Sequence, residues 1–279
     1  MNNLFLYILI FFFGGAIGSF VNVVVDRLYI KSFIKGRSMC QSCSKTLSWY
    51  ETIPILSYLF LKGRCKNCKV KIGEKHLWTE IVTGILAMFT YNILLSSYFN
   101  IYSPNYNLMT GIGFALFYVF IFILLLSIFL YDLKHKIVPL GMSILLLISG
   151  LAIEVYRIYN ITSFYGNIHS PLFWLDIFSG ILIALPFLII YLFTNGKAVG
   201  FGDILLFLST GYLLGFIFGV TDFLLSIWIG AAFSLLLIYL FPHKYSRKST
   251  IPFAPFIVVA TILVIFFHID IIGLSLILH

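Results

Sequence analysis

Long apolar segments alternate with short polar ones along almost the whole chain. Eight of these segments approach the roughly 20 residues that a helix needs to cross the hydrocarbon core of a bilayer. They cover residues 4–25, 78–97, 108–131, 137–156, 172–194, 203–220, 223–241 and 251–272. One polar interval, residues 28–77, is much longer than the others. The pattern predicts an all-α polytopic membrane protein with about eight transmembrane helices and a small insert between the first two.

Composition supports a membrane protein. Of the 279 residues, 61% are hydrophobic and 10% are charged, whereas soluble domains carry about 25% charged residues. The first segment begins MNNLFLYILIFFF and lacks the basic stretch that precedes the apolar part of a secretory signal. We therefore expect a retained first helix with its N-terminus outside the cell.

Basic residues are distributed unevenly between the polar intervals. With the N-terminus outside, residues 27–77, 132–136, 195–202 and 242–250 face the cytoplasm, and they hold 17 of the 18 Lys and Arg residues. Arg157 alone falls in an outer interval. The positive-inside rule supports this orientation and a cytoplasmic insert. The net charge of +8 favours anionic lipid headgroups as partners, and without a recognisable binding motif it does not support nucleic acid.

All four cysteines lie in the insert, as the pairs Cys40/Cys43 and Cys65/Cys68. Two CxxC pairs at about this separation can place four thiolates around one zinc ion. The alternatives are two disulfides or four idle thiols, and a reducing cytoplasm disfavours the disulfides. Because all four ligands come from the protein, we expect a structural zinc that holds a short insert folded.

Two acidic residues stand at the predicted cytoplasmic boundary of the membrane. Asp132 ends the third apolar segment in FLYDLKHKIVPLG, and Asp203 opens the sixth in GFGDILL. Two carboxylates at one depth can share a proton and activate a water molecule, as an aspartic protease requires. The alternative for each is an interfacial ion pair with a nearby lysine, such as Lys134 or Lys197.

The ends of the helices predict different settings for the two aspartates. A helix N-terminus favours an anion at Asp203, and a helix C-terminus disfavours one at Asp132. Our hypothesis is that Asp203 is the ionised base and Asp132 the protonated acid, although a coupled pair titrates as a unit. Gly200 and Gly202 carry no Cβ, so we expect the backbone beside Asp203 to approach a substrate strand closely.

Several short motifs together resemble those of type IV prepilin peptidases, which are bifunctional membrane enzymes also called leader peptidase and N-methyltransferase. GAIGSFVNVVVDRL is similar to the family's GSFxNVxxxR signature. The two CxxC pairs, WYETIPILSYLFLKGRC, HLWTEIVTG, YDLKHKIVP, GFGD and IPFAPFI follow in the family's order. The resemblance covers nearly the whole chain. Leu205, Leu140 and Ala254 depart from a lysine, an acidic residue and a glycine that are common in relatives.

The resemblance implies a fold and an activity. Together with the apolar segments, it leads us to expect the first transmembrane helix at residues 1–27, the zinc-binding cytoplasmic insert at 28–77 and the transmembrane catalytic domain at 78–279. Asp132 and Asp203 are implied to be the catalytic pair, supported by Gly200 and Gly202. They would cleave the basic leader of prepilins and pseudopilins at the cytoplasmic face of the bacterial inner membrane. Such an enzyme serves type IV pilus biogenesis or type II secretion, and its oligomeric state stays open.

The resemblance also implies methylation of the new N-terminal residue with S-adenosylmethionine. Candidates for this step lie in the N-terminal signature and the insert: Asn22, Arg27, Glu51 and Glu80. Each has an ordinary alternative. Asn22 could bond another helix, Arg27 a lipid phosphate, and Glu80 the basic loop. No glycine-rich dinucleotide fingerprint is present in the sequence.

Two other classes of protein compete with this interpretation. Presenilin-like proteases also pair a YD helix with a GxGD helix, but they cut within the bilayer and lack the CxxC insert. A multi-span transporter with proton-relaying aspartates would carry its polar groups near the bilayer midplane. In this sequence the two aspartates lie at the predicted boundary instead.

Overall fold

The computed structural model describes residues 3–28, 38–40, 42–95, 108–160, 171–242, 251–271 and 273. These residues form helices joined by short connections, and within them the only β-pairing is two isolated antiparallel bridges. The chain divides into two compact units, the first made of residues 1–99 and 107–123 and the second of residues 100–106 and 124–279. The predicted all-α class is therefore confirmed for the described part of the chain.

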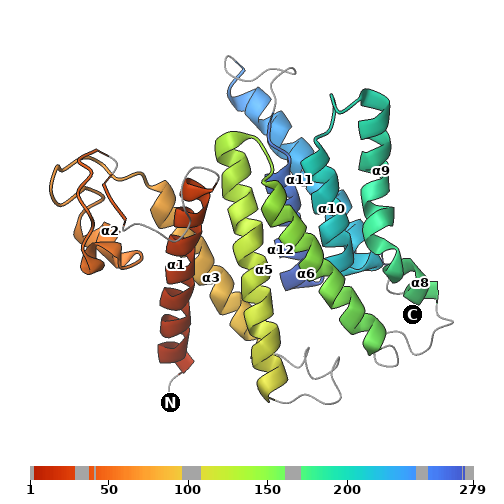
Figure 1. Cartoon of the computed structure of the whole chain (residues 1–279), viewed down its shortest axis with the longest axis horizontal. Coiled ribbons are helices and arrows are strands. Elements are labelled where there is room, and N and C mark those ends of the chain that lie inside the picture. The colour runs from red at the N-terminus through yellow and green to blue at the C-terminus, as the bar shows by residue number, and fades with distance from the viewer. Residues whose placement is uncertain are drawn as a thin grey trace. The chain divides into compact units, whose positions relative to one another are not determined.

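The first unit is built on a pair of antiparallel helices. It contains α1 (Asn3–Arg27), η1 (Trp49–Thr52), α2 (Leu56–Phe60), α3 (Lys75–Leu95) and the first part of α5 (Leu108–His135). Glycines let α1 and α3 approach closely (Figure 1). A Cβ on Gly14 would lie 2.6 Å from both the Ala87 Cβ and the Thr83 carbonyl oxygen. Such small-residue contacts commonly join helices in membranes, where hydrophobic burial cannot drive association.

The second unit is organised around α10. Besides the end of α5 it contains α6 (Leu140–Tyr159), α8 (Pro171–Ile177), α9 (Ser179–Thr194), α10 (Phe201–Leu214), α11 (Phe216–Leu240) and α12 (Ala254–Phe267). Helix α10 packs against α6, α9, α11 and α12 (Figure 1). Its Phe207 is fully buried and makes an edge-to-face contact with Phe187 and a tilted ring contact with Phe223. Polar residues on α10 therefore face other helices.

Helices occupy all eight predicted apolar segments. Four helices are long and apolar enough to span a membrane, namely Leu4–Arg27, Leu116–His135, Leu140–Tyr159 and Phe216–Leu240, and three shorter apolar helices accompany them. The described segments therefore agree with a multi-pass membrane protein. The last residues of the predicted second and eighth segments, 96–97 and 272, lie outside the described residues.

Two predicted boundaries are wrong. Helix α10 ends at Leu214 and α11 begins at Phe216, so the break falls at Gly215 and not at 221–222. Gly215 adopts φ +80°, a conformation that is open to glycine and strained for other residues. The predicted fifth segment is also divided, at Phe178, into α8 and α9. Asp222, which the predicted boundaries leave between two helices, lies inside α11.

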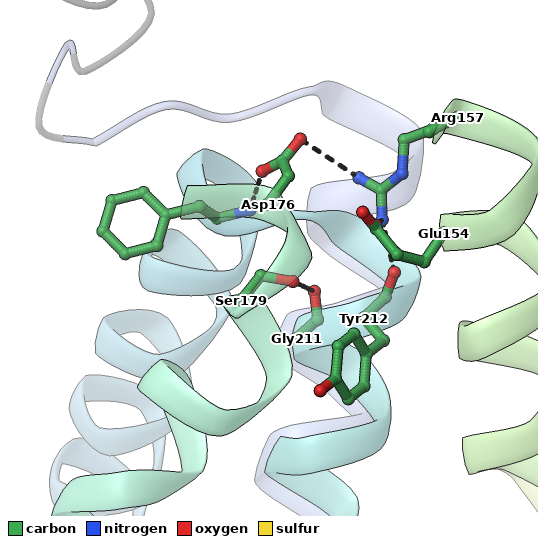
Figure 2. A network of polar contacts seen from close by, with 7 residues as sticks. Glu154, Arg157, Asp176, Ser179, Gly211 and Tyr212 are labelled. Carbon is green, nitrogen blue, oxygen red and sulfur yellow. Dashed lines mark hydrogen bonds and ion pairs between the residues drawn. The ribbon is translucent and has the colours of Figure 1, made fainter. Parts of the chain in front are cut away.

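A buried ion-pair network surrounds this break (Figure 2). The guanidinium of Arg157 is 2.6 Å from Glu154 Oε2 and 3.7 Å from Asp176 Oδ2. It also donates a hydrogen bond to the carbonyl oxygen of Tyr212, in the last turn of α10. All three charged side chains are buried, so each depends on the others for neutralisation.

The same network explains two details of the fold. Asp176 Oδ1 accepts a hydrogen bond of 2.6 Å from the N–H of Phe216, the first residue of α11. A Cβ on Gly215 would collide with Arg157, so glycine is needed there for space as well as for conformation. Arg157 is thus not a residue of an outer loop, as the sequence suggested, but a buried partner in the last turn of α6.

Candidate functional site

Asp132 and Asp203 come together in the second unit. Asp132 lies in the last turn of α5 and is only 3% exposed. Asp203 lies in the first turn of α10. The two carboxylates are close enough for the charge of Asp132 to act on Asp203. The structure therefore joins two residues that are 71 positions apart in the sequence.

A tight contact brings these helix ends together. Gly202 faces Val138, in the turn that follows α5, and a Cβ on Gly202 would lie 2.5 Å from the Val138 Cβ. Any side chain at position 202 would push the first turn of α10 away from this segment. Gly200 is different, because its φ of −78° is open to all residues and an added Cβ would make only an ordinary contact. Gly202 therefore has a packing role that the sequence motif alone does not reveal.

Each carboxylate faces the amino end of a helix. The backbone N–H of Gly200, the N-cap of α10, lies within hydrogen-bonding reach of Asp203. The backbone N–H of Ala254, the first residue of α12, lies within reach of Asp132. Helix N-termini carry unpaired N–H groups and favour anions. The sequence predicted this setting for Asp203 alone; the IPFAPF stretch, with a proline at the start of a helix, is the signal that was missed for Asp132.

The arrangement is suited to acid–base chemistry. Two carboxylates that act on each other can hold one proton between them, so that one is a base and the other an acid. The base can take a proton from water while the acid polarises a carbonyl group. Because α10 and α12 each present an N–H group to a carboxylate, the surroundings of Asp132 and Asp203 differ less in how they favour a negative charge than the sequence implied.

The four cysteine thiols form one cluster in the insert. The Sγ atoms of Cys40, Cys43, Cys65 and Cys68 all lie within 4.8 Å of one another, and none is in a disulfide. A tetrahedral zinc site with Zn–S bonds of about 2.3 Å places its sulfur atoms about 3.8 Å apart. The Sγ atoms of Cys40 and Cys68 are separated by 3.7 Å. The cluster therefore fits a single tetrahedral metal ion.

The same turn occurs at both CxxC pairs. The carbonyl oxygen of Cys40 accepts a hydrogen bond from the N–H of Ser44, and that of Cys65 accepts one from Lys69. Ser44 and Lys69 both have positive φ, 54° and 58°. An antiparallel bridge closes each turn. Two matching turns present their thiols to one point, which is typical of structural metal knuckles.

Backbone N–H groups favour the thiolate form of two cysteines. The N–H of Lys45 lowers the pKa of Cys43 to about 6. Hydrogen bonds from the backbone of Cys68 and Asn67 lower the pKa of Cys65. Thiolates, not thiols, are metal ligands, so these N–H groups prepare the cluster for a cation.

Of the four methyl-transfer candidates, Glu80 lies at the contact between α1 and α3. The hydroxyl of Ser19, one helical turn before Asn22, lies within reach of the Glu80 carboxylate. Glu80 Oε2 accepts a 2.7 Å hydrogen bond from the N–H of Ile55. Asn22 Nδ2 is buried and has no hydrogen-bond partner among the described residues. The buried Asn22 amide therefore has hydrogen-bonding capacity that the described residues do not use.

The other two candidates have different surroundings. Glu51 Oε2 accepts a 2.7 Å hydrogen bond from the N–H of Ser48 and so caps η1. Arg27 is in the last turn of α1 and is half-buried. Ile55, beside Glu80, adopts φ +62° and ψ −53°. For a β-branched residue this is a strained conformation, and such strain is concentrated at functional sites.

Comparison with known proteins gives consistent matches. A model of the bacterial peptidase A24 N-terminal domain matches residues 12–94, and a model of the type IV leader peptidase family matches residues 119–235. No solved structure is significantly similar to the chain.

Several curated relatives carry the same name, prepilin leader peptidase/N-methyltransferase. The protein from Bacillus subtilis is 30% identical over 257 residues, which are 91% of this chain and 92% of the relative. The protein from Legionella pneumophila is 26% identical over 94% of this chain and 91% of the relative. The match to the protein from Myxococcus xanthus is 31% identical but spans 52% of this chain and 39% of that protein.

Metal binding is the first prediction. The purified chain should bind one Co²⁺ ion, with the intense sulfur-to-metal charge-transfer absorption of a site with four thiolate ligands, because all four Sγ atoms converge on one point. Cys65→Ser should reduce the absorption and weaken binding at least about tenfold. Ser57→Ala, a matched change in the insert outside the cluster, should leave both unchanged. A wild-type protein whose cysteines are recovered as two disulfides would contradict the assignment.

Proposed function

This chain belongs to the type IV leader peptidase family, and we propose that it is a membrane aspartic endopeptidase that also methylates its product. It removes the basic leader of type IV prepilins and pseudopilins and N-methylates the new N-terminal residue. The relatives' names carry the two activities. On this chain, cleavage is supported by the proximity of Asp132 and Asp203. Asp203 lies in the first turn of α10, and Asp132 lies within reach of the first N–H of α12.

Asp132 and Asp203 are the proposed catalytic pair. The ionised carboxylate takes a proton from a water molecule, whose oxygen attacks the scissile carbonyl carbon, and the protonated carboxyl donates to the carbonyl oxygen. As the C–N bond breaks, the leaving amine gains a proton from the pair. Helix N-termini at both carboxylates hold the negative charge that the pair must retain.

The location of the pair fits the substrate class. A precursor held in the membrane by an apolar helix carries its basic leader at the cytoplasmic end, so its scissile bond lies at the membrane boundary. Asp132 ends one apolar helix and Asp203 begins another. We propose that this end of the second unit faces the cytoplasm of a bacterial inner membrane, as the distribution of basic residues indicates.

Zinc is the proposed metal of the cysteine cluster. Four thiolates and no open position suit a structural zinc ion, which supplies folding energy rather than chemistry. Among the described residues of the insert, only Ile55 and Cys65 are buried apolar residues, so we infer that a metal is needed to hold its two turns together.

Asn22 and Glu80 are the proposed core of the methyl-transfer site. When bound, S-adenosylmethionine supplies an activated methyl group. The unpaired Asn22 amide and the Glu80 carboxylate offer a donor and an acceptor for the polar parts of the cofactor or for the substrate amine. Glu80 is also a base that can accept the proton that the new N-terminal ammonium must lose before it attacks the methyl group. Arg27 and Glu51 stay candidates.

Anionic lipids are a proposed partner of the insert. Pro54 packs 3.4 Å from the Cβ position of Gly15, in the middle of α1, and α2 begins two residues later. Leu59 and Phe60 of α2 are 59% and 82% exposed. A five-residue helix extends only about 8 Å, so these side chains cannot lie far from the lipid beside α1.

The positive charge of the insert also supports anionic lipid as its partner. The segment that follows α2 carries five basic residues, Lys62, Arg64, Lys66, Lys69 and Lys71. Lys66 donates a 3.0 Å hydrogen bond to the hydroxyl of Tyr50, so basic and aromatic groups are mixed on one face. Aromatic residues with nearby basic side chains are typical of surfaces that lie in the headgroup layer.

Loss of either catalytic carboxylate should abolish cleavage. Asp132→Asn and Asp203→Asn should each reduce cleavage of a model prepilin at least about 10³-fold, because neither variant retains an acid and a base. Mass spectrometry of the products measures this directly. Both variants should still methylate a peptide that is supplied already cut. Asp270→Asn is the matched control and should cleave normally. Cleavage at wild-type rate by either variant would reject the pair.

Loss of the methyl-transfer site should have the converse effect. Glu80→Gln and Asn22→Ala should reduce methylation of the pre-cut peptide at least about 10²-fold, since Gln cannot accept the ammonium proton and Ala removes the free amide. Mass spectrometry should show an unmethylated mature product that is made at the normal rate. If both variants methylate normally, the site lies elsewhere on the chain.

Membrane contact of the insert is testable by fluorescence. In a variant with Trp78, Trp174 and Trp228 replaced by Phe, the emission of Trp49 should be quenched by brominated lipids, and more strongly in vesicles that contain anionic lipid. Replacement of Leu59 and Phe60 by Ser should weaken the quenching. Trp49 emission that responds to aqueous iodide but not to brominated lipid would instead indicate a free surface, open to a protein partner.

A further inference from the structure

Asp222 is a fully buried carboxyl group that the proposed chemistry does not use. It lies in the second turn of α11 and is 0% exposed. Within the described residues it forms no ion pair with a basic side chain. An unpaired carboxylate in such surroundings is very costly, and a buried carboxyl group without a cation is normally neutral.

Two threonines from neighbouring helices contact this carboxyl group. Thr261 Oγ1 of α12 lies 3.1 Å from Asp222 Oδ1, and the hydroxyl of Thr210 of α10 is within hydrogen-bonding reach. Both threonines are 0% exposed. Asp222, on α11, therefore hydrogen-bonds to α12 through Thr261 and lies beside the Thr210 hydroxyl of α10.

These contacts supply too few donors for an ionised Asp222 carboxylate. Thr261 Oγ1 lies 2.8 Å from the Ile257 carbonyl oxygen as well as 3.1 Å from Asp222, yet a hydroxyl has one proton to donate. Asp222 Oδ2 and Thr210 Oγ1 are both buried and lack a partner of good geometry among the described residues. A proton on Asp222 Oδ2 removes the charge that these contacts do not compensate, and it gives that oxygen a hydrogen to donate to the Thr210 hydroxyl.

The two threonines occupy equivalent positions relative to the proposed active site. Thr210 follows Asp203 by seven residues on α10, and Thr261 follows Ala254 by seven on α12. Seven residues are nearly two helical turns, about 10 Å along the axis, and return to the same face. Asp203 is one of the proposed catalytic carboxylates, and the N–H of Ala254 reaches the other, Asp132. Asp222 thus lies between the two helices that present groups to the site.

We propose that Asp222 is a positioning residue. As a neutral carboxylic acid it fixes α10 against α12, and it thereby keeps Asp203 and the Ala254 N–H next to the Asp132 carboxyl group. This inference rests on the proposed peptidase function. A shift of about 1 Å in one helix is enough to cost roughly 10²-fold in rate when it misplaces reacting groups. The role requires hydrogen bonds from Asp222 but no charge.

Asp222→Asn and Asp222→Leu distinguish this role from others. The Asn amide can donate to Thr210 and accept from Thr261, as a neutral acid does, so kcat for prepilin cleavage should stay within about threefold of wild type, with an unchanged pH profile. Leu has the same branching and number of heavy atoms as Asp and cannot form the hydrogen bonds, so kcat should fall roughly 10- to 100-fold with KM nearly constant. An infrared difference spectrum between wild type and Asp222→Asn should show the carbonyl band of a protonated carboxylic acid.

The combined variant Thr210→Val and Thr261→Val keeps the carboxyl group and removes its partners, and it should reproduce the loss in kcat. Thermal unfolding of all variants identifies any that fail to fold. If Asp222→Asn loses activity like Asp222→Leu, or shifts the pH profile, Asp222 acts through its charge and the proposal is overturned. Normal activity of a folded Asp222→Leu also overturns it. Continued cleavage by Asp132→Asn or Asp203→Asn would instead reject the catalytic pair, and a wild-type protein that does not cleave prepilin would reject the peptidase assignment itself.

Discussion

An apolar helical bundle can hold an ionisable side chain in its interior only where another group pairs with it, hydrogen-bonds to it or neutralises it. Arg157 illustrates this condition, because it is buried between Glu154 and Asp176. Asp222 meets it with hydroxyl groups and Glu80 with a backbone N–H. Each of these groups connects segments that are distant in the chain. The few polar residues therefore determine how the apolar helices fit together.

The same condition explains the location of the proposed catalytic pair. At the N-terminus of a helix, the backbone N–H groups have no carbonyl partner within the helix and can donate to other groups. Asp132 and Asp203 each use one, from α12 and α10 respectively. Gly202 makes this possible because it lets α10 begin against Val138. Two acidic side chains are thus held beside each other, where one is readily protonated and the other can act as a base.

The insert follows a different principle. It is too short to form an apolar core, and its two CxxC turns converge on one point instead. The segment between those turns then packs on α1 and α3 through Pro54 and Ile55. The strained backbone at Ile55 is stabilised by the hydrogen bond to Glu80. The proposed metal ligation and the contact with the helices together order a polar segment that composition alone would leave unfolded.

The apolar segments, the two cysteine pairs and the positions of Asp132 and Asp203 at helix ends were all predictable from the sequence. These features depend on local composition and spacing, and a segment of about 20 apolar residues has few alternatives in a bilayer. The break at Gly215, the burial of Arg157, the N–H of Ala254 at Asp132 and the place of Asp222 inside α11 were decided by the tertiary structure. Each results from contacts between residues far apart in the chain, and hydrophobic periodicity carries no information about which helices meet.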